Sequence, residues 1–132
     1  MRGFLIDKKA LVRAAMDARQ FSYSPFSGFA VGAALLSEDG AVYTGCNIEN
    51  SSYSPTICAE RCAVAKAVSE GKRRFVAIAV AGPEDANTTP CGVCRQVLYE
   101  FCDEDMIVLC AGTEENFMET TLGALLPKGF RL

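Results

Sequence analysis

The stretch RFVAIAVAG, residues 74–82, is almost wholly apolar and lies between polar segments. An apolar run of this length is typical of a strand that is buried on both faces of a sheet. The segment CGVCRQVLYEF, residues 91–101, predicts a helix, and MIVLCAG, residues 106–112, predicts a second buried strand. Two strands joined through a helix lie parallel in one sheet, so this unit predicts an α/β fold.

The flanking segments complete the predicted sheet. A helix is expected from Asp7, a good N-cap residue, to about Arg19. The runs at 29–37 and 41–47 flank Glu-Asp-Gly and predict a hairpin. The segment NFMETT, residues 116–121, follows the fourth strand too closely for a crossover, so it should pair with that strand antiparallel. We therefore expect a three-layer α/β/α fold with a mixed five-stranded sheet.

The composition limits the class of protein. The 132 residues fit a single domain, and no apolar run approaches the ~20 residues of a membrane helix. The first twenty residues are too charged for a secretory signal. The net charge of −3, without a cluster of Lys and Arg, disfavours nucleic-acid binding. We expect a soluble cytoplasmic protein that binds neither membranes nor nucleic acids.

The chain has seven cysteines and no histidine. The absence of histidine excludes every Ser-His or Cys-His catalytic pair, and any metal must be held by Cys, Asp or Glu. An odd number of cysteines without a secretory signal disfavours a disulfide framework and favours metal binding or catalysis.

Three of these cysteines stand at predicted helix starts. Cys91 and Cys94 open the helix over 91–101, and Cys58 opens a helix over 58–71. The N-terminal end of a helix stabilises a thiolate, and three thiolates around zinc leave a fourth position open, as in catalytic sites. Glu60, in the first turn after Cys58, is placed to act as a proton shuttle without being a ligand. The pattern predicts one Zn²⁺ per chain.

A non-enzymatic alternative uses a fourth cysteine. Cys62 lies one turn after Cys58 and would close a four-cysteine structural zinc site with Cys91 and Cys94. We expect instead that Cys62 packs in the core, because it shares a helix face with Ala65. Three further cysteines are interpreted as small core residues in the same way: Cys46, Cys102 and Cys110.

Cys58-Ala59-Glu60 followed by Pro90-Cys91-Gly92-Val93-Cys94 resembles the signature of the zinc-dependent deaminases. With YSPFSGFAVGAALL, GCNIENSSY and PCGVCRQVLYEF, the chain resembles the small cytidine deaminases of nucleoside salvage, in their three-cysteine, homotetrameric branch. The similarity covers residues 23–101 and the LLP…GF tail. It implies one catalytic domain over residues 1–132 that hydrolyses cytidine and deoxycytidine to uridine and deoxyuridine, with release of ammonia. A deaminase of another aminopyrimidine nucleoside is the remaining enzymatic alternative.

The resemblance also implies roles for residues around the zinc. Asn47 and Glu49 would bind ribose hydroxyls, and a carboxylate there would favour a free nucleoside over a nucleotide. The backbone of Ala59 would bind the pyrimidine edge, and Arg61 would hydrogen-bond the thiolates. Phe29 either contacts the substrate or is a core residue.

Other implied contacts come from a neighbouring subunit. The tail LLPKGFRL, residues 125–132, is apolar enough to dock on a surface. The resemblance implies that Phe130 stacks on the pyrimidine in a neighbour's site, and that Ser51 and Tyr53 also cross an interface of the homotetramer.

Overall fold

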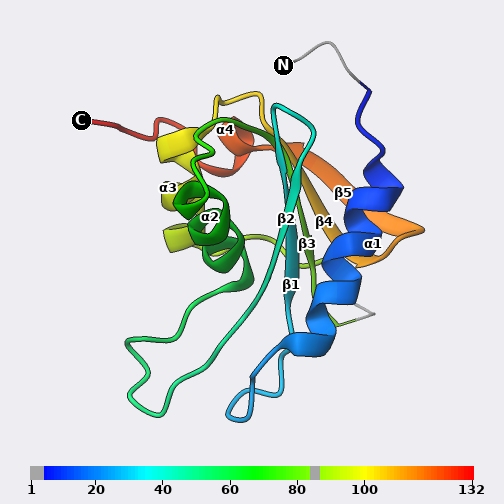
Figure 1. The fold of residues 1–132 in the computed structure, drawn as a ribbon, viewed down its shortest axis with the longest axis vertical. Coiled ribbons are helices and arrows are strands. Elements are labelled where there is room, and N and C mark those ends of the chain that lie inside the picture. Colours follow the sequence, from blue (N-terminus) through cyan, green and yellow to red (C-terminus); the bar gives the residue numbers. More distant parts are fainter. Residues whose placement is uncertain (1–4, 84–86) are drawn as a thin grey trace.

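A mixed five-stranded sheet runs through the protein, seen here in a computed structural model that describes residues 5–83 and 87–132 (Figure 1). Its strands are β1 (Gly32–Ser37), β2 (Val42–Cys46), β3 (Phe75–Ala81), β4 (Ile107–Thr113) and β5 (Asn116–Thr121). They lie in the order β2-β1-β3-β4-β5. Only β3 and β4 pair in parallel, and β5 pairs antiparallel to β4, which confirms the predicted mixed sheet.

Helices cover both faces of this sheet. The helices are α1 (Lys8–Ala18), α2 (Ala59–Ser69), α3 (Gly92–Phe101) and α4 (Leu122–Leu125). In Figure 1, α1 lies on one side of the sheet, and α2 and α3 lie on the other. The three-layer arrangement is therefore confirmed. No helix in the described ranges is long and apolar enough to cross a membrane.

The central strand β3 serves both layers of the core. Ile78 and Val80 pack with the α2 and α3 side, whereas Ala77 and Ala79 pack with the α1 side. All four side chains have no exposed surface. This double burial is why the run at 74–82 shows no polar alternation.

The first helix begins as predicted from its cap. The side chain of Asp7 accepts a hydrogen bond of 3.1 Å from the backbone N–H of Ala10, which satisfies one free donor of the first turn. Leu11, Val12 and Ala15 then face the sheet and are buried.

The predicted core face of α2 is wrong. Ala65 is exposed and Cys62 is only half-buried, while the buried residues include Ala63 and Ala67. The reason is a close approach to β2: a Cβ at Gly45 would lie 2.5 Å from the carbonyl oxygen of Ala59 and 2.6 Å from the backbone nitrogen of Ala63. This contact turns Ala63 toward the sheet and leaves Cys62 at the edge of the interface.

The three remaining cysteines divide between core and edge. Cys102 and Cys110 are buried, as predicted. Cys46 is half-buried, so its prediction as a core residue is wrong. It ends β2, which is an edge strand with a neighbour on one side only.

Candidate active site

Three cysteine sulfurs meet where two helices begin. Cys58 is the N-cap of α2, Cys91 is the N-cap of α3, and Cys94 lies in the first turn of α3. Their Sγ atoms all lie within 4.8 Å of one another, and those of Cys58 and Cys91 are 3.7 Å apart. Neither N-cap side chain makes a capping hydrogen bond, so both sulfurs remain directed at the shared point.

This cluster fits zinc. Two sulfurs bound about 2.3 Å from a tetrahedral zinc are about 3.8 Å apart, which matches the separation of Cys58 and Cys91. Within residues 5–83 and 87–132, it is also the one group of potential ligands close enough to hold a metal. Cys62 is outside the group. The residues present therefore form a three-thiolate set with room for a fourth ligand, and not a closed four-cysteine site.

The Cys94 thiol and Arg61 stabilise the thiolate form of Cys58. A hydrogen bond from the Cys94 thiol, together with Arg61, lowers the pKa of Cys58 to about 5. The Nη2 of Arg61 lies 3.6 Å from the Cys58 Sγ and 3.5 Å from the carbonyl oxygen of Thr56. The hydrogen bond to Cys58, followed by burial, raises the pKa of Cys94. Both shifts favour the thiolate form at Cys58 and the thiol form at Cys94.

Glu60 is a buried carboxyl beside this cluster. Only 4% of its surface is exposed, and it stands in the first turn of α2. Burial raises its pKa to about 7. A carboxyl in this state can exchange a proton near neutral pH, which general acid–base chemistry requires.

A second arginine holds the segment that leads into α3. The Nε of Arg95 donates to the carbonyl oxygen of Pro90 at 2.7 Å, and its Nη1 donates to that of Leu125 at 2.9 Å. Pro90 is fully buried and directly precedes Cys91. Arg95 therefore fixes the approach to Cys91 against α4. This role of Arg95 was not predicted, since nothing in the sequence indicates which carbonyl groups an arginine will reach.

Isolated bridges bring the loop at 47–50 to the start of α2. Ile48 and Ile57 exchange backbone hydrogen bonds of 3.0 Å in an antiparallel bridge. Tyr23 pairs with the other side of Ile48, in parallel. Because Ile57 directly precedes Cys58, these bridges hold the loop at 47–50 alongside the segment that leads into α2.

The side chain of Asn47 braces the neighbouring loop. Its Oδ1 accepts from the backbone N–H of Val31 at 2.9 Å and from the hydroxyl of Ser22. Its Nδ2 donates to the carbonyl oxygen of Phe29 at 2.8 Å. Asn47 therefore shapes the loop before β1, in addition to any contact with a ligand through its second Nδ2 hydrogen.

Glu49 is held by the same loop. Its Oε1 accepts from the backbone N–H groups of Phe26 and Ser27, at 2.8 and 3.2 Å, and its Oε2 accepts from the Ser27 hydroxyl. The Ser27 hydroxyl is the main cause of the lowered pKa of Glu49. The carboxylate is thus fixed, ionised and oriented. Ser27 was not predicted as a site residue, because it stands in a serine-rich loop with no distinguishing pattern.

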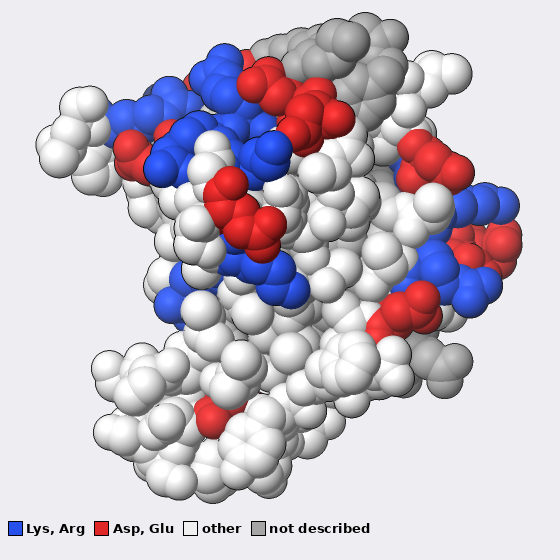
Figure 2. All heavy atoms as spheres, viewed as in Figure 1, with Lys and Arg blue, Asp and Glu red and all other residues white. Residues whose placement is uncertain are grey.

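Four predicted contact residues are exposed. Phe29, Tyr53 and Phe130 are 43%, 75% and 67% exposed, and Ser51 is exposed as well. Tyr53 packs edge-on against Phe26, with ring centroids 6.4 Å apart. Phe26 and Phe29 belong to the loop 22–30, and Tyr53 belongs to the loop 48–57. Together these two loops contain one charged residue, Glu49. Figure 2 shows this weakly charged region at the bottom of the view.

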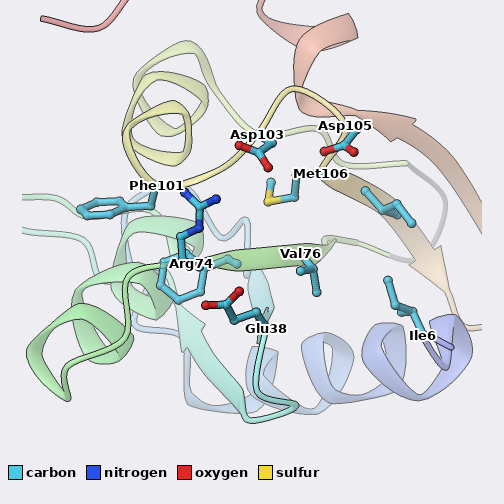
Figure 3. Close-up of a pocket in the computed structure, with 10 residues that line it drawn as sticks. Ile6, Glu38, Arg74, Val76, Phe101, Asp103, Asp105 and Met106 are labelled. Carbon is cyan, nitrogen blue, oxygen red and sulfur yellow. The ribbon is translucent and has the colours of Figure 1, made fainter. Parts of the chain in front are cut away.

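A separate pocket lies at the opposite end of β3. It has a volume of ≈ 190 Å³ and is lined by residues that include Arg74, Val76, Phe101 and Met106 (Figure 3). Arg74 directly precedes β3, so the pocket lies at the N-terminal end of this strand. Cys91 lies on the connection that leaves the C-terminal end of β3 and leads into α3. None of the predicted site residues lines this pocket. The candidate active site is therefore the cysteine cluster, whose side chains can bind a metal, and not this pocket.

Comparisons with known proteins agree with this geometry. Residues 6–110 match the family described as "Cytidine and deoxycytidylate deaminase zinc-binding region". The cytidine deaminase of Sporosarcina psychrophila is 50% identical over 125 residues, covering 95% of this chain and 92% of that protein. The crystal structure of cytidine deaminase from Burkholderia pseudomallei is 42% identical, with a TM-score of 0.89, and covers 95% and 100% of the two chains. That of the Mycobacterium tuberculosis enzyme is 40% identical with a TM-score of 0.86, and covers 97% and 100%.

Proposed function

Because the chain belongs to the cytidine and deoxycytidylate deaminase family, we propose that it hydrolyses cytidine and deoxycytidine to uridine and deoxyuridine, with release of ammonia. The observation that carries this proposal is the cluster of Cys58, Cys91 and Cys94 beside the buried carboxyl of Glu60. A structural zinc site has no use for such a carboxyl.

The three cysteines are the proposed zinc ligands, and Glu60 is the proposed acid and base. Zinc, when bound, makes water acidic enough to supply a nucleophile near neutral pH. Glu60 accepts the proton that the attacking water loses and delivers it to N3 of the pyrimidine. It then moves the remaining proton of that water, now on the hydroxyl at C4, to the amine, which leaves as ammonia while the C4–O bond becomes the carbonyl of uridine. Glu60 can serve both transfers because it lies in the first turn of α2, directly after the N-cap residue Cys58, and so remains close to the proposed zinc site throughout.

Two neighbours of Glu60 complete the chemistry. Arg61 offsets the net charge of −1 that three thiolates and Zn²⁺ would carry, and its contact with the Cys58 Sγ supports this role. The backbone of Ala59, the first residue of α2, binds the edge of the pyrimidine. A backbone site there is supported by the burial of Ala59, since its side chain already packs in the core.

The sugar is recognised by the loop at 47–50. The Oε2 of Glu49 accepts only from the Ser27 hydroxyl among its described contacts, so a lone pair remains for a ribose hydroxyl. A second negative charge on a phosphate would be repelled by this carboxylate. The site therefore favours nucleosides over nucleotides. Asn47 contributes by holding Phe29 and Val31 in the shape that faces this sugar.

The assembly is proposed to be a homotetramer with shared sites. The support is the exposed, weakly charged surface of the loops 22–30 and 48–57, which carries Tyr53 and is suited to an interface. Ser51, Tyr53 and Phe130 would then reach a neighbour's site. We place this single catalytic domain in the cytoplasm, in pyrimidine salvage.

A substrate comparison tests the function. The zinc-loaded protein is incubated with cytidine, deoxycytidine and cytidine monophosphate, and the loss of cytidine absorbance is followed together with ammonia release. We expect one ammonia per nucleoside consumed and little reaction of the nucleotide. A zinc-loaded protein that is inert toward all three would indicate a structural zinc site or another aminopyrimidine substrate.

A further inference from the structure

The tail of the chain is fastened to α3 by Arg131. Its Nε donates to the carbonyl oxygen of Tyr99 at 2.7 Å, and its Nη2 donates to that of Cys102 at 2.9 Å. The guanidinium carbon also lies 4.1 Å from the centre of the Tyr99 ring. One side chain thus makes three separate contacts with the end of a single helix.

This end of α3 is a favourable place for a cation. The last carbonyl groups of a helix lack partners within the helix and carry the negative end of its dipole. Cys102 is the C-cap of α3, and Tyr99 lies in the last turn. The Tyr99 ring is itself fixed, because it is 4% exposed and its hydroxyl donates to the Oε2 of Glu104 at 3.0 Å. Arg131 therefore binds a rigid platform.

Contacts with α3 hold the backbone on either side of Phe130, whereas the residue itself is exposed. The Nε2 of Gln96 donates to the carbonyl oxygen of Phe130 at 3.3 Å, and Arg131 anchors the next residue. A Cβ at Gly129 would lie 3.1 Å from atoms of the Tyr99 ring, so the preceding residue also lies tightly against α3. Phe130 as a residue nevertheless remains 67% exposed. Its backbone is held against α3 while the residue stays accessible to a ligand or to a neighbouring chain.

We infer that Arg131 is a positioning residue for substrate binding, which acts by holding the Phe130 ring in the orientation that meets the pyrimidine. This inference rests on the proposed contact between Phe130 and the base. Arg131 itself makes no contact with the reacting atoms. Its effect should appear in the affinity for nucleoside and not in the chemical step.

A double-mutant cycle tests the inference. A base stacked on an aromatic ring contributes ~5- to 150-fold in affinity, so Phe130→Ala should raise KM within that range. Arg131→Met should raise KM by a part of this, about 3- to 10-fold, with kcat and bound zinc unchanged. In the Phe130→Ala background, Arg131→Met should change KM no further. Arg131→Lys, which keeps the charge but loses the two-pronged geometry, should restore KM only in part.

The matched control is Lys128→Met, which removes an exposed cation from the same tail. Its KM should equal that of the unmodified protein. Hydrogen exchange at the amides of residues 129–132 supplies a readout independent of activity, and Arg131→Met should accelerate it whereas Lys128→Met should not.

The outcomes separate two failures. If Phe130→Ala leaves KM unchanged, the proposed contact with the base is wrong, and this inference falls with it. If Phe130→Ala raises KM but Arg131→Met does not, only the positioning role is wrong. An equal effect of Arg131→Met in both backgrounds would also overturn it, because Arg131 would then act independently of Phe130.

Discussion

The Sγ of Cys58 lies 3.7 Å from the Sγ of Cys91, at the point where α2 and α3 both begin. The contact exists because the βαβ crossover places the start of α3 beside the start of α2, on the same face of the sheet. Two helix N-termini directed at one point favour anionic ligands there, and thiolates are the anions present. The cysteine cluster therefore depends on how the fold places the two helix starts, and not only on the spacing of the cysteines in the sequence.

Cys62→Ala and Cys94→Ala should affect the metal differently. Cys62 is half-buried and lies outside the ligand cluster, so its truncation should cost about 1 kcal/mol of stability and leave one zinc per chain. Cys94→Ala removes a ligand and should release the zinc. Elemental analysis of both purified variants measures this. Zinc loss from Cys62→Ala would favour the four-cysteine structural site.

Glu60→Gln should abolish most turnover without releasing the metal. The amide fills the same buried space, but it cannot accept and return a proton. General acid–base catalysis contributes ~10²- to 10⁴-fold, and Glu60 is proposed to act in two transfers, so the loss of kcat should be at the upper end. The thermal midpoint and the zinc content serve as controls. A variant with near-normal kcat would refute the assigned role.

Mixing two inactive or impaired variants tests whether Phe130 acts across an interface. Glu60→Gln protein and Phe130→Ala protein are combined under conditions in which subunits exchange. Sites that pair an intact Glu60 with a donated Phe130 should make activity at low substrate exceed the sum of the separate variants. Merely additive activity, after exchange has been demonstrated by mass labelling, would place Phe130 within its own chain's site or outside any site.

The buried thiol of Cys102 predicts a loss of stability in alkali. Burial raises its pKa to about 12 from an ordinary 9.0, so the folded chain keeps this proton after the unfolded chain has lost it. The resulting stability is full below pH 9 and declines as the pH rises toward 12, by up to ~1.4 kcal/mol per pH unit.

Urea unfolding at pH 8 and pH 10, with zinc in excess, measures this effect. Cys102→Ala lacks the titrating group, so its disadvantage relative to the unmodified protein should shrink by about 1 kcal/mol between the two values. A stability difference that stays constant with pH would show that the thiol does not carry the dependence.

The sheet was predictable because its signals are local. The apolar run of β3, the hairpin at Glu38-Asp39-Gly40 and the short link before β5 each determine one connection. Together they indicate a mixed sheet of five strands, although they do not indicate the antiparallel pairing of β1 with β3 that fixes the strand order. The cysteine cluster was predictable for a related reason, since its members stand at the N-cap or in the first turn of helices that the sequence itself indicates.

The contacts that shape the site were not predictable in this way. The face of α2 depends on how closely its backbone approaches Gly45, which a helical pattern does not contain. The bonds from Ser27 to Glu49 and from Arg95 to Pro90 join loops whose relative position only the folded chain defines. Such side-chain contacts can be identified only once the fold is known.

A zinc titration tests whether one zinc per chain is required for the deamination of cytidine. Protein stripped of metal by a chelator is reloaded with increasing zinc, while bound zinc and the rate of cytidine loss are measured in the same samples. We expect activity to be absent without metal, to rise in proportion to bound zinc and to reach its plateau at one zinc per chain. Full activity in the stripped protein, or zinc binding at one per chain with no deamination of cytidine, would contradict this expectation.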